Sequence, residues 1–508
     1  MRTKIAKKLA NSKRRIERRL DKENLTGCEQ PMFTAHNIDY EIAGRTRGIA
    51  HGGIGALHVM AKQIGLVDGI DRHLDLLKFH RPFHESDHVL NFAYNALCEG
   101  TCLQDIELRR NDEVFLDALG ARRIPDPTTA GDFCRRFTSV DINSLQSVFN
   151  DVRRNLWKRQ PPSFFDLATI DMDGSLVGTT GQCKQGMDIA YDGTWGYHPL
   201  VLSLAETGEV LWLVNRSGNR PSHEGAATAV DRVVKLCRKA GFRKVLLRGD
   251  TDFSQSEHLD RWHAEGTLFV FGFDAMPNLK GIAEDLPAEA WQPLTRLPAY
   301  TAQTQPRQRP VNVKEGIVVE RGFENQRLGS EEVAEFAYRP TACSQAYRMV
   351  VIRKNISVSK GEKLLFDEVR YFFYITNITV LDREQVVWTA NQRGNQENVL
   401  AQLKGAVSAL KAPVNTLESN WAYMVMTALA WNLKAWWALM LPVSAGRWRQ
   451  CHAEDKQWVL GLEFKTFVQA FVRLPCQIVR TGRKLVYRLL SWNPHQRIFW
   501  RLITALRC

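Results

Sequence analysis

The chain changes its hydrophobic periodicity twice, and these changes divide it into three parts. Apolar residues recur three and four positions apart in Ala56–Ile64, Val89–Leu97 and Phe115–Leu119, which is the spacing of helices with one buried face. From about Phe164 the apolar runs become short and are separated by turn residues, a pattern typical of strands. After Lys411 the helical spacing returns. We therefore expect helical N-terminal and C-terminal regions around a central part that contains a sheet.

The central part predicts a particular order of elements. The predicted elements are, in order, the strands Leu167–Asp173, Leu200–Ala205 and Val210–Asn215, the helix Glu224–Lys239, the strand Lys244–Leu247, the helix Ser254–Glu265 and the strand Thr267–Phe273. Three antiparallel strands followed by helix, strand, helix and strand are the order of an RNase H-like α/β core.

Residues 274–385 interrupt this order before the core is complete. The segment around Pro306–Pro310 predicts a loop. Alternating patterns after it predict further strands, namely Gly316–Arg321, Glu335–Arg339, Tyr347–Arg353 and Glu368–Asn377. The interruption is therefore expected to be a mostly β insertion, after which the chain returns to helices.

Composition and charge favour a large globular protein with a polyanionic partner. The 508 residues suffice for about three domains, and 68 basic against 55 acidic residues give a net charge of +13. The basic excess is concentrated in residues 1–23 and 441–508, and two basic ends on one chain favour nucleic acid as the partner. The N-terminal segment, which we expect to be a loosely ordered basic arm, lacks the apolar core of a signal peptide.

Cysteine usage and one apolar segment bear on the compartment. The ten Cys are dispersed, which is typical of a reducing cytoplasm, and Cys451-His452 has no second ligand pair to complete a zinc site. Trp421–Leu441 is almost wholly apolar but carries Asn432 and Lys434 near its centre. A charge there would cost about 2.5–3.5 kcal/mol in a bilayer, so a helix buried in a protein core is the better interpretation.

Three acidic residues lie where the predicted core would bring them together. Asp173 ends the first strand, Asp250 follows the fourth, and Glu397 lies on the helix after the insertion. Clustered carboxylates repel one another unless a cation joins them, and hard oxygen ligands suit Mg²⁺ or Mn²⁺. Asp171 competes with Asp173 on the same strand face, and Asp252 competes with Asp250, although Asp252 is better placed to cap the next helix.

The third acid belongs to a characteristic helix. Arg393, Glu397 and Lys404 stand four and seven residues apart, which places them on one stripe of a single helix. Taken alone, the first two would be an ordinary ion pair on a helix surface.

Together these residues resemble a known family. Asp173-Gly174-Ser175, Arg248-Gly249-Asp250 and Arg393-Gly394-x-x-Glu397-Asn398 are similar to the motifs of the DDE transposases of bacterial insertion sequences. The spacing R-x3-E-x6-K is that family's third-acid signature, usually written Y-x2-R-x3-E-x6-K. The Arg-Gly-x-x-Glu-Asn form is similar to insertion sequence family 1380. One departure is Ala390, which stands at the signature Tyr position, so that an aromatic contact to DNA would either come from Trp388, Trp421 or elsewhere, or be absent.

The resemblance implies a function and its parts. Asp173, Asp250 and Glu397 would be the catalytic residues and the ligands of two Mg²⁺ ions, for which Mn²⁺ could substitute. Arg393, Lys404 and Asn398 would bind DNA. The partners would be double-stranded DNA, as terminal inverted repeats and target, and a second copy of the chain.

The implied reaction is two-metal cleavage and strand transfer in cut-and-paste DNA transposition, carried out in the bacterial cytoplasm near the nucleoid and not at a membrane. A metal-dependent nuclease of the same fold and a catalytically silent DNA-binding relative are the alternatives. We thus expect a basic arm and helical DNA-binding region at 1–160, an RNase H-like core at 161–273 and 386–445, a β-rich insertion at 274–385, and a basic helical tail at 446–508.

Overall fold

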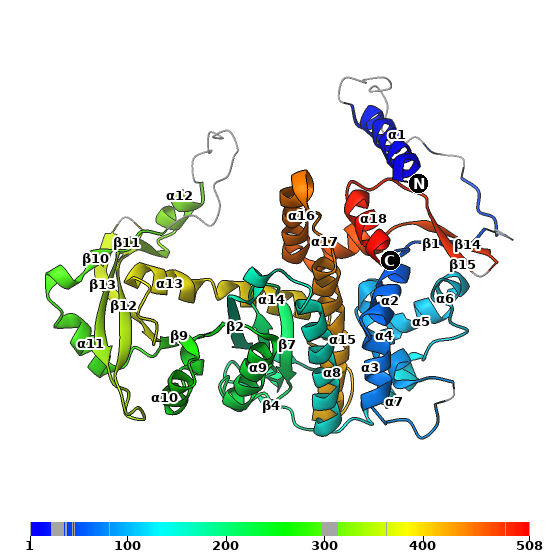
Figure 1. Cartoon of the computed structure of the whole chain (residues 1–508). Coiled ribbons are helices and arrows are strands. Elements are labelled where there is room, and N and C mark those ends of the chain that lie inside the picture. Colours follow the sequence, from blue (N-terminus) through cyan, green and yellow to red (C-terminus); the bar gives the residue numbers. More distant parts are fainter. Residues whose placement is uncertain are drawn as a thin grey trace. The chain divides into compact units, whose positions relative to one another are not determined.

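A computed structural model of the chain (Figure 1) describes residues 2–21, 35, 38–42, 44, 46–80, 82–296, 313–361, 363–482 and 484–506. Contacts divide the chain into two compact units, and we describe each by itself. Unit 1 comprises 1–160, 177–187 and 401–508, whereas unit 2 comprises 161–176 and 188–400.

Unit 2 is built on one nine-stranded mixed sheet with the strand order β10-β11-β12-β13-β9-β8-β2-β6-β7. Its strands are β2 (Leu167–Gly174), β6 (Leu200–Leu204), β7 (Glu209–Val214), β8 (Lys244–Gly249), β9 (Leu268–Phe273), β10 (Gln292–Pro293), β11 (Glu324–Tyr338), β12 (Tyr347–Lys360) and β13 (Lys363–Thr376). Its longer helices are α9 (Ala226–Ala240), α10 (Ser256–Ala264), α11 (Pro277–Glu284), α12 (Val313–Glu320) and α13 (Arg383–Asn391). A short pair of strands, β4 (Asp188–Ile189) and β5 (Trp195–Tyr197), lies outside the large sheet.

The centre of this sheet confirms the predicted order of elements. β2 pairs antiparallel with β6 and parallel with β8, and β8 pairs parallel with β9. The β2 side chains from Ala168 to Met172 are buried, as expected for a central strand with covered faces. Because β2 and β8 run in the same direction, their carboxyl ends open on the same edge of the sheet, and this edge carries Asp173 and Asp250.

The segment between β9 and α13 continues the same sheet. β13 pairs antiparallel with β9, and β12 and β11 follow outward. One hydrophobic cluster includes Leu246 of β8, Val270 of β9, Val350 of β12 and Val386 of α13, so that the added strands share a core with the central ones.

Two predictions within this segment have different outcomes. Gly316–Arg321 was predicted as a strand, but Val313–Glu320 is the helix α12. The run of Ile317, Val318 and Val319 favours a strand locally, and this preference is overridden here, as strand propensity often is. The loop predicted at Pro306–Pro310 lies outside the described residues.

Unit 1 is mainly helical, as predicted. Its longer helices are α1 (Arg2–Leu20), α2 (Ile54–Gln63), α3 (Leu66–His73), α4 (Glu85–Leu97), α6 (Glu113–Leu119), α7 (Pro127–Cys134), α8 (Ser139–Trp157), α15 (Leu417–Leu439), α16 (Arg449–Gly461) and α18 (Gln496–Ala505). Helix α14 (Gly394–Lys404) begins in unit 2 and ends in unit 1.

The apolar segment Trp421–Leu441 forms most of α15, in which every residue from Ser419 to Leu439 is buried. Lys434 is also buried, and its Nζ donates to the Leu460 carbonyl oxygen at 2.8 Å. No helix in the described ranges combines the length and the apolar character that crossing a membrane requires.

Both basic ends differ from the sequence prediction. The expected loose arm contains the 19-residue helix α1, whose Ala, Lys, Arg and Glu content favours a helix. The C-terminal tail is helical only in part, because β14 (Cys476–Thr481) and β15 (Lys484–Leu489) form a hairpin that also pairs with β1 (Gly48–Ile49). The sequence signal for this hairpin was a pair of short strand-favouring apolar runs, Ile478-Val479 and Leu485–Tyr487, on either side of Gly482, whose φ is +53°.

Candidate active site at the sheet edge

Asp173 lies near the carboxyl end of β2, where β2 pairs with β6. It is opposite Val201 of β6, and its side chain is 16% exposed. The next residue, Gly174, leaves room for His198, because a Cβ at this position would lie 2.5 Å from His198 Nε2. The glycine of the Asp-Gly-Ser motif is therefore required by close packing beside the acid.

Asp171, the competing acid on β2, forms an ion pair with an arginine of the neighbouring strand β8. Arg248 of β8 donates from Nε to Asp171 Oδ1 at 2.7 Å and from Nη2 to Oδ2 at 2.8 Å. Both side chains are almost completely buried. This two-pronged pair satisfies Asp171, so that Asp173 is the β2 carboxylate that reaches the sheet edge.

Asp250 follows β8 directly and opens a short turn. Its Oδ1 accepts from the backbone N–H of Asp252 at 3.1 Å, so Asp250 itself caps the turn Thr251–Phe253. The prediction that Asp252 caps the following helix is wrong, because α10 begins at Ser256 after Gln255. The inserted turn moves the helix start beyond the reach of Asp252.

Glu397 lies in the first turn of α14, which is anchored to β6 by its neighbour Gln396. The buried Gln396 side chain donates from Nε2 to the Val201 carbonyl oxygen at 3.0 Å and accepts from the Ser203 hydroxyl. Glu397 itself is 68% exposed. The hydrogen bonds of Gln396 thus fix the start of α14, and this fixes the position of the exposed Glu397 at the edge of the sheet.

The single-helix stripe needs a correction. α13 ends at Asn391, a turn contains Gln392 and Arg393, and α14 begins at Gly394. Arg393 therefore precedes the helix that carries Glu397 and Lys404. Its backbone N–H bonds to the Ala390 carbonyl oxygen at 3.1 Å, which closes the turn.

Arg393 lies among the three acids. Its Nη1 is 3.0 Å from Asp173 Oδ2 and 4.0 Å from Asp250 Oδ2, and its Nη2 is 3.6 Å from Glu397 Oε1. Arg393 was predicted to bind DNA. In this structure its guanidinium is the common partner of carboxylates from two strand ends and a helix. The three predicted acids are therefore brought together.

Burial and mutual repulsion perturb two of these carboxyl groups. Desolvation raises the pKa of Asp173 to about 6, Arg393 opposes this shift, and the charge of Asp250 adds to it. Desolvation also raises the pKa of Asp250, again opposed by Arg393. Both shifts show that burial, only partly offset by one guanidinium, disfavours the ionised forms of these carboxyl groups.

This donor set fits divalent cations of the Mg²⁺ type. Three carboxylates with one exposed member provide hard oxygen ligands and leave room for further oxygen ligands. Asp173, Asp250 and Glu397 are the residues that could hold such ions.

A cavity of about 430 Å³ lies beside the acids in unit 2. Its lining includes Asp250, Arg393 and Glu397, and it also includes Ala390 and an aromatic group formed by Phe273, Tyr371, Phe372, Phe373 and Tyr374. These aromatic residues were missed as site residues, because aromatic residues within strands such as β9 and β13 are most often part of ordinary strand packing.

The remaining predicted residues have mixed placements. Asn398 and Lys404 are exposed on α14. Trp421 is buried in α15 and presents no exposed ring, whereas Trp388 on α13 is half-buried.

An acid triad at a sheet edge that could hold divalent cations is an arrangement compatible with metal-dependent phosphoryl transfer. Residues 31–508 match the model of the family described as Transposase DDE domain group 1, and the chain belongs to this family. It is thus a transposase, of a family that uses divalent metal ions.

The other comparisons add little. A cryo-EM structure of a piggyBac transposase synaptic complex with hairpin DNA is similar at 12% identity and a TM-score of 0.37, over 83% of this chain and 82% of that one. No curated protein sequence matches the chain.

Proposed function

We propose that the chain cleaves DNA at the terminal inverted repeats of an insertion sequence of the family 1380 type and joins the freed ends to target DNA. The observation that supports this most directly is the convergence of Asp173, Asp250 and Glu397 on Arg393. The central strand order β9-β8-β2-β6-β7, with the added strands beyond β9, supports an RNase H-like core with a β insertion. The five-part division of the chain stays a prediction.

Asp173, Asp250 and Glu397 would hold two Mg²⁺ ions, with Mn²⁺ able to substitute. Bound there, the ions supply Lewis-acid stabilisation of the attacking and leaving oxygens at phosphorus. The chain's own part is to keep the carboxylates ionised and aligned. Gln396 fixes the helix of Glu397, the Asp171–Arg248 pair fixes β2 against β8, and Gly174 lets His198 pack against the strand end.

Arg393 has two roles in this proposal. In the metal-free protein it neutralises part of the triad's charge at 3.0 to 4.0 Å. Once cations occupy the carboxylates, repulsion favours its turning toward the DNA backbone, whose phosphates accept paired N–H donors. Lys404 and Asn398, exposed on the same helix, are proposed to bind phosphates as well.

The aromatic lining of the cavity suggests how the chain does without the signature Tyr. Ala390 lies on the lining together with Tyr371 and Tyr374. We propose that Tyr374, which packs against the same hydrophobic cluster as Ala390, supplies the contact to the DNA end, since an aromatic face stacks on any base. The paired ends would require two copies of the chain, acting on DNA in the bacterial cytoplasm.

The test is cleavage of DNA that carries the inverted repeats flanking the gene. Asp173→Asn, Asp250→Asn and Glu397→Gln should each reduce Mg²⁺-dependent nicking by more than about a hundredfold, since even an outer partner of a metal ligand is worth 10–100-fold. Asp252→Asn is the matched control and should cleave like the wild type. Unchanged nicking by Glu397→Gln would refute the assignment.

A second assay separates the transposase from a nuclease of the same fold. Pre-cleaved ends and a supercoiled target plasmid are supplied with Mg²⁺, and joined products are counted. Joining supports the transposase, nicking without joining identifies the nuclease, and DNA binding without either identifies a silent relative.

A further inference from the structure

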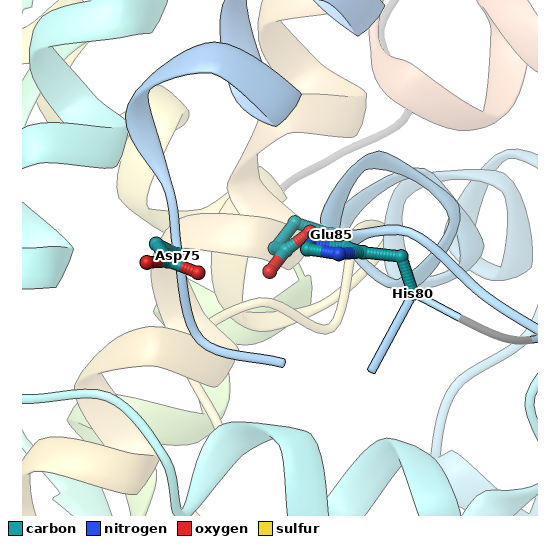
Figure 2. Close-up of side chains that lie close together, drawn as sticks. All are labelled: Asp75, His80 and Glu85. Atoms are coloured by element: carbon teal, nitrogen blue, oxygen red, sulfur yellow. Dashed lines mark ion pairs between the residues drawn. The ribbon is translucent and has the colours of Figure 1, made fainter. Parts of the chain in front are cut away.

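A second cluster of metal-ligating side chains lies in unit 1. The connection between α3 and α4 runs from Leu74 to His84, and it brings Asp75 and His80 to Glu85, the first residue of α4. One donor atom from each of these three residues lies within 4.8 Å of the other two. Figure 2 shows the Glu85 carboxylate between the Asp75 and His80 side chains.

The central ligand is an oriented, buried carboxylate. Glu85 is completely buried, and its Oε1 accepts from the backbone N–H groups of Leu76 and Leu77, both at 3.0 Å. Its Oε2 is buried and has no hydrogen-bond partner among the residues that the structure describes. An ionised carboxylate removed from water is costly unless a charge compensates it. Glu85 Oε2 is therefore the atom at which a bound cation would offset the cost of burial.

The neighbours of this oxygen do not fully supply one. His80 Nε2 lies 3.1 Å from Oε2, outside hydrogen-bond geometry. Arg136 approaches the same loop, but its Nη1 donates to the Leu76 carbonyl oxygen at 3.1 Å. Within the described residues, His80 is therefore the one positively ionisable side chain that lies within 4 Å of Glu85 Oε2.

From this arrangement we infer that Asp75, His80 and Glu85 form a binding site for a divalent cation of the Zn²⁺ class. Two ligands about 2.0–2.1 Å from a tetrahedral Zn²⁺ stand ~3.3 Å apart, close to the observed separation of His80 Nε2 and Glu85 Oε2. An imidazole beside two carboxylates favours Zn²⁺ and similar transition metals over Mg²⁺.

The surroundings orient these ligands. The Leu76 and Leu77 N–H groups hold the Glu85 carboxylate, and the ring of His80 stacks on that of His84 with centroids 5.3 Å apart. Such outer contacts are typical of metal sites. Three protein ligands leave a fourth position for water, and the bound ion would fasten the α3–α4 connection to the start of α4.

The test uses the full-length chain carrying Asp173→Asn, Asp250→Asn and Glu397→Gln, so that the sheet-edge carboxylates do not bind the added metal. Metal-stripped protein is titrated with Zn²⁺ against a chromophoric chelator. This triple variant is the parent, and we expect it to bind one more Zn²⁺ than the same protein with His80→Gln. Adding Asp75→Asn to the parent should weaken this binding at least about tenfold.

Two further measurements make the result decisive. His73→Gln, which removes an exposed histidine whose ring hydrogen-bonds to the Gly69 carbonyl oxygen of its own helix, is the control and should bind Zn²⁺ like the parent. Zn²⁺ should raise the melting temperature of the parent and of His73→Gln but not of His80→Gln. Equal Zn²⁺ binding by the parent and by both His80→Gln and Asp75→Asn would overturn the inference. Both tested side chains are exposed, so these variants are expected to fold even if Glu85→Gln does not.

Discussion

Four buried or partly buried charged groups, two in each unit, differ in the partners that surround them. In unit 2, Arg248 and Asp171 are buried together in a two-pronged pair, and Arg393 is shared among three acids. In unit 1, the partners of the buried Lys434 among the described residues are the Leu460 carbonyl oxygen and the face of Trp431, 4.1 Å from Nζ to the ring centre. Glu85 likewise meets two backbone N–H groups and an imidazole. These acids of unit 2 are thus paired with an arginine of the same unit, whereas Lys434 and Glu85 of unit 1 rely on backbone groups and rings.

The largest expected effect comes from breaking the balanced pair. Arg248→Met should lower the free energy of unfolding by about 3–5 kcal/mol, because Asp171 would remain as an uncompensated buried charge. Urea unfolding monitored by tryptophan fluorescence measures this. Arg243→Met, which breaks an exposed pair with Asp166, is the control and should cost no more than about 1 kcal/mol. A similar loss in both variants would contradict the distinction between buried and exposed pairs.

Replacing the unbalanced lysine should act in the opposite direction. Burial lowers the pKa of Lys434 to about 7, so between pH 7 and 10.5 the unfolded chain binds more protons than the folded one. The contribution of Lys434 to the stability of the wild type should therefore rise with pH across this window, because the cost of burying the charge disappears.

Lys434→Met should remove that rise and stabilise the protein below pH 7, by on the order of 2–4 kcal/mol. Urea unfolding at pH 6.5, 8 and 9.5 tests this. Lys411→Met is the control, since Lys411 also donates to a carbonyl oxygen, that of Thr101, but at the surface. A Lys434→Met protein that keeps the wild-type pH slope would show that Lys434 is not its source.

A smaller effect is expected from Arg393. Arg393→Gln should destabilise the metal-free protein by about 1 kcal/mol, because the triad is partly exposed and loses its shared cation. It should also enlarge the rise in melting temperature that Mg²⁺ produces, since the ions no longer compete with a guanidinium. The comparison is made against Arg261→Gln, a surface arginine in an ion pair with Asp231. An equal Mg²⁺ response in wild type and Arg393→Gln would contradict this role.

The sequence predicts the core of unit 2 well, because periodicity and chemistry agree there. The strand ending at Asp173 and the strand before Asp250 are short apolar runs closed by acids, and the structure places both where predicted. The helix of Glu397 was also expected, although its start was misplaced by one residue because Arg393 has a helical spacing to Glu397 while lying in a turn.

Other features depend on contacts that no local pattern encodes. Arg248 and Asp171 are 77 residues apart, and their pairing follows from the parallel register of β8 on β2. The cluster of Asp75, His80 and Glu85 has no familiar metal spacing, because the intervening loop sets its geometry. Tyr371 and Tyr374 become site residues only because β13 joins the sheet beside β9.

The division into units has a consequence for dissecting the protein. Along the sequence the chain passes from one unit to the other after residues 160, 176, 187 and 400, and the last passage occurs inside α14. A single proteolytic cut therefore cannot release either unit as a covalently separate fragment. No terminal truncation at these points yields an intact half, and a cut within α14 would sever the helix that carries Glu397. Each unit is built from segments that are separated in the sequence, so separating the units requires a redesign of the order in which these segments are connected.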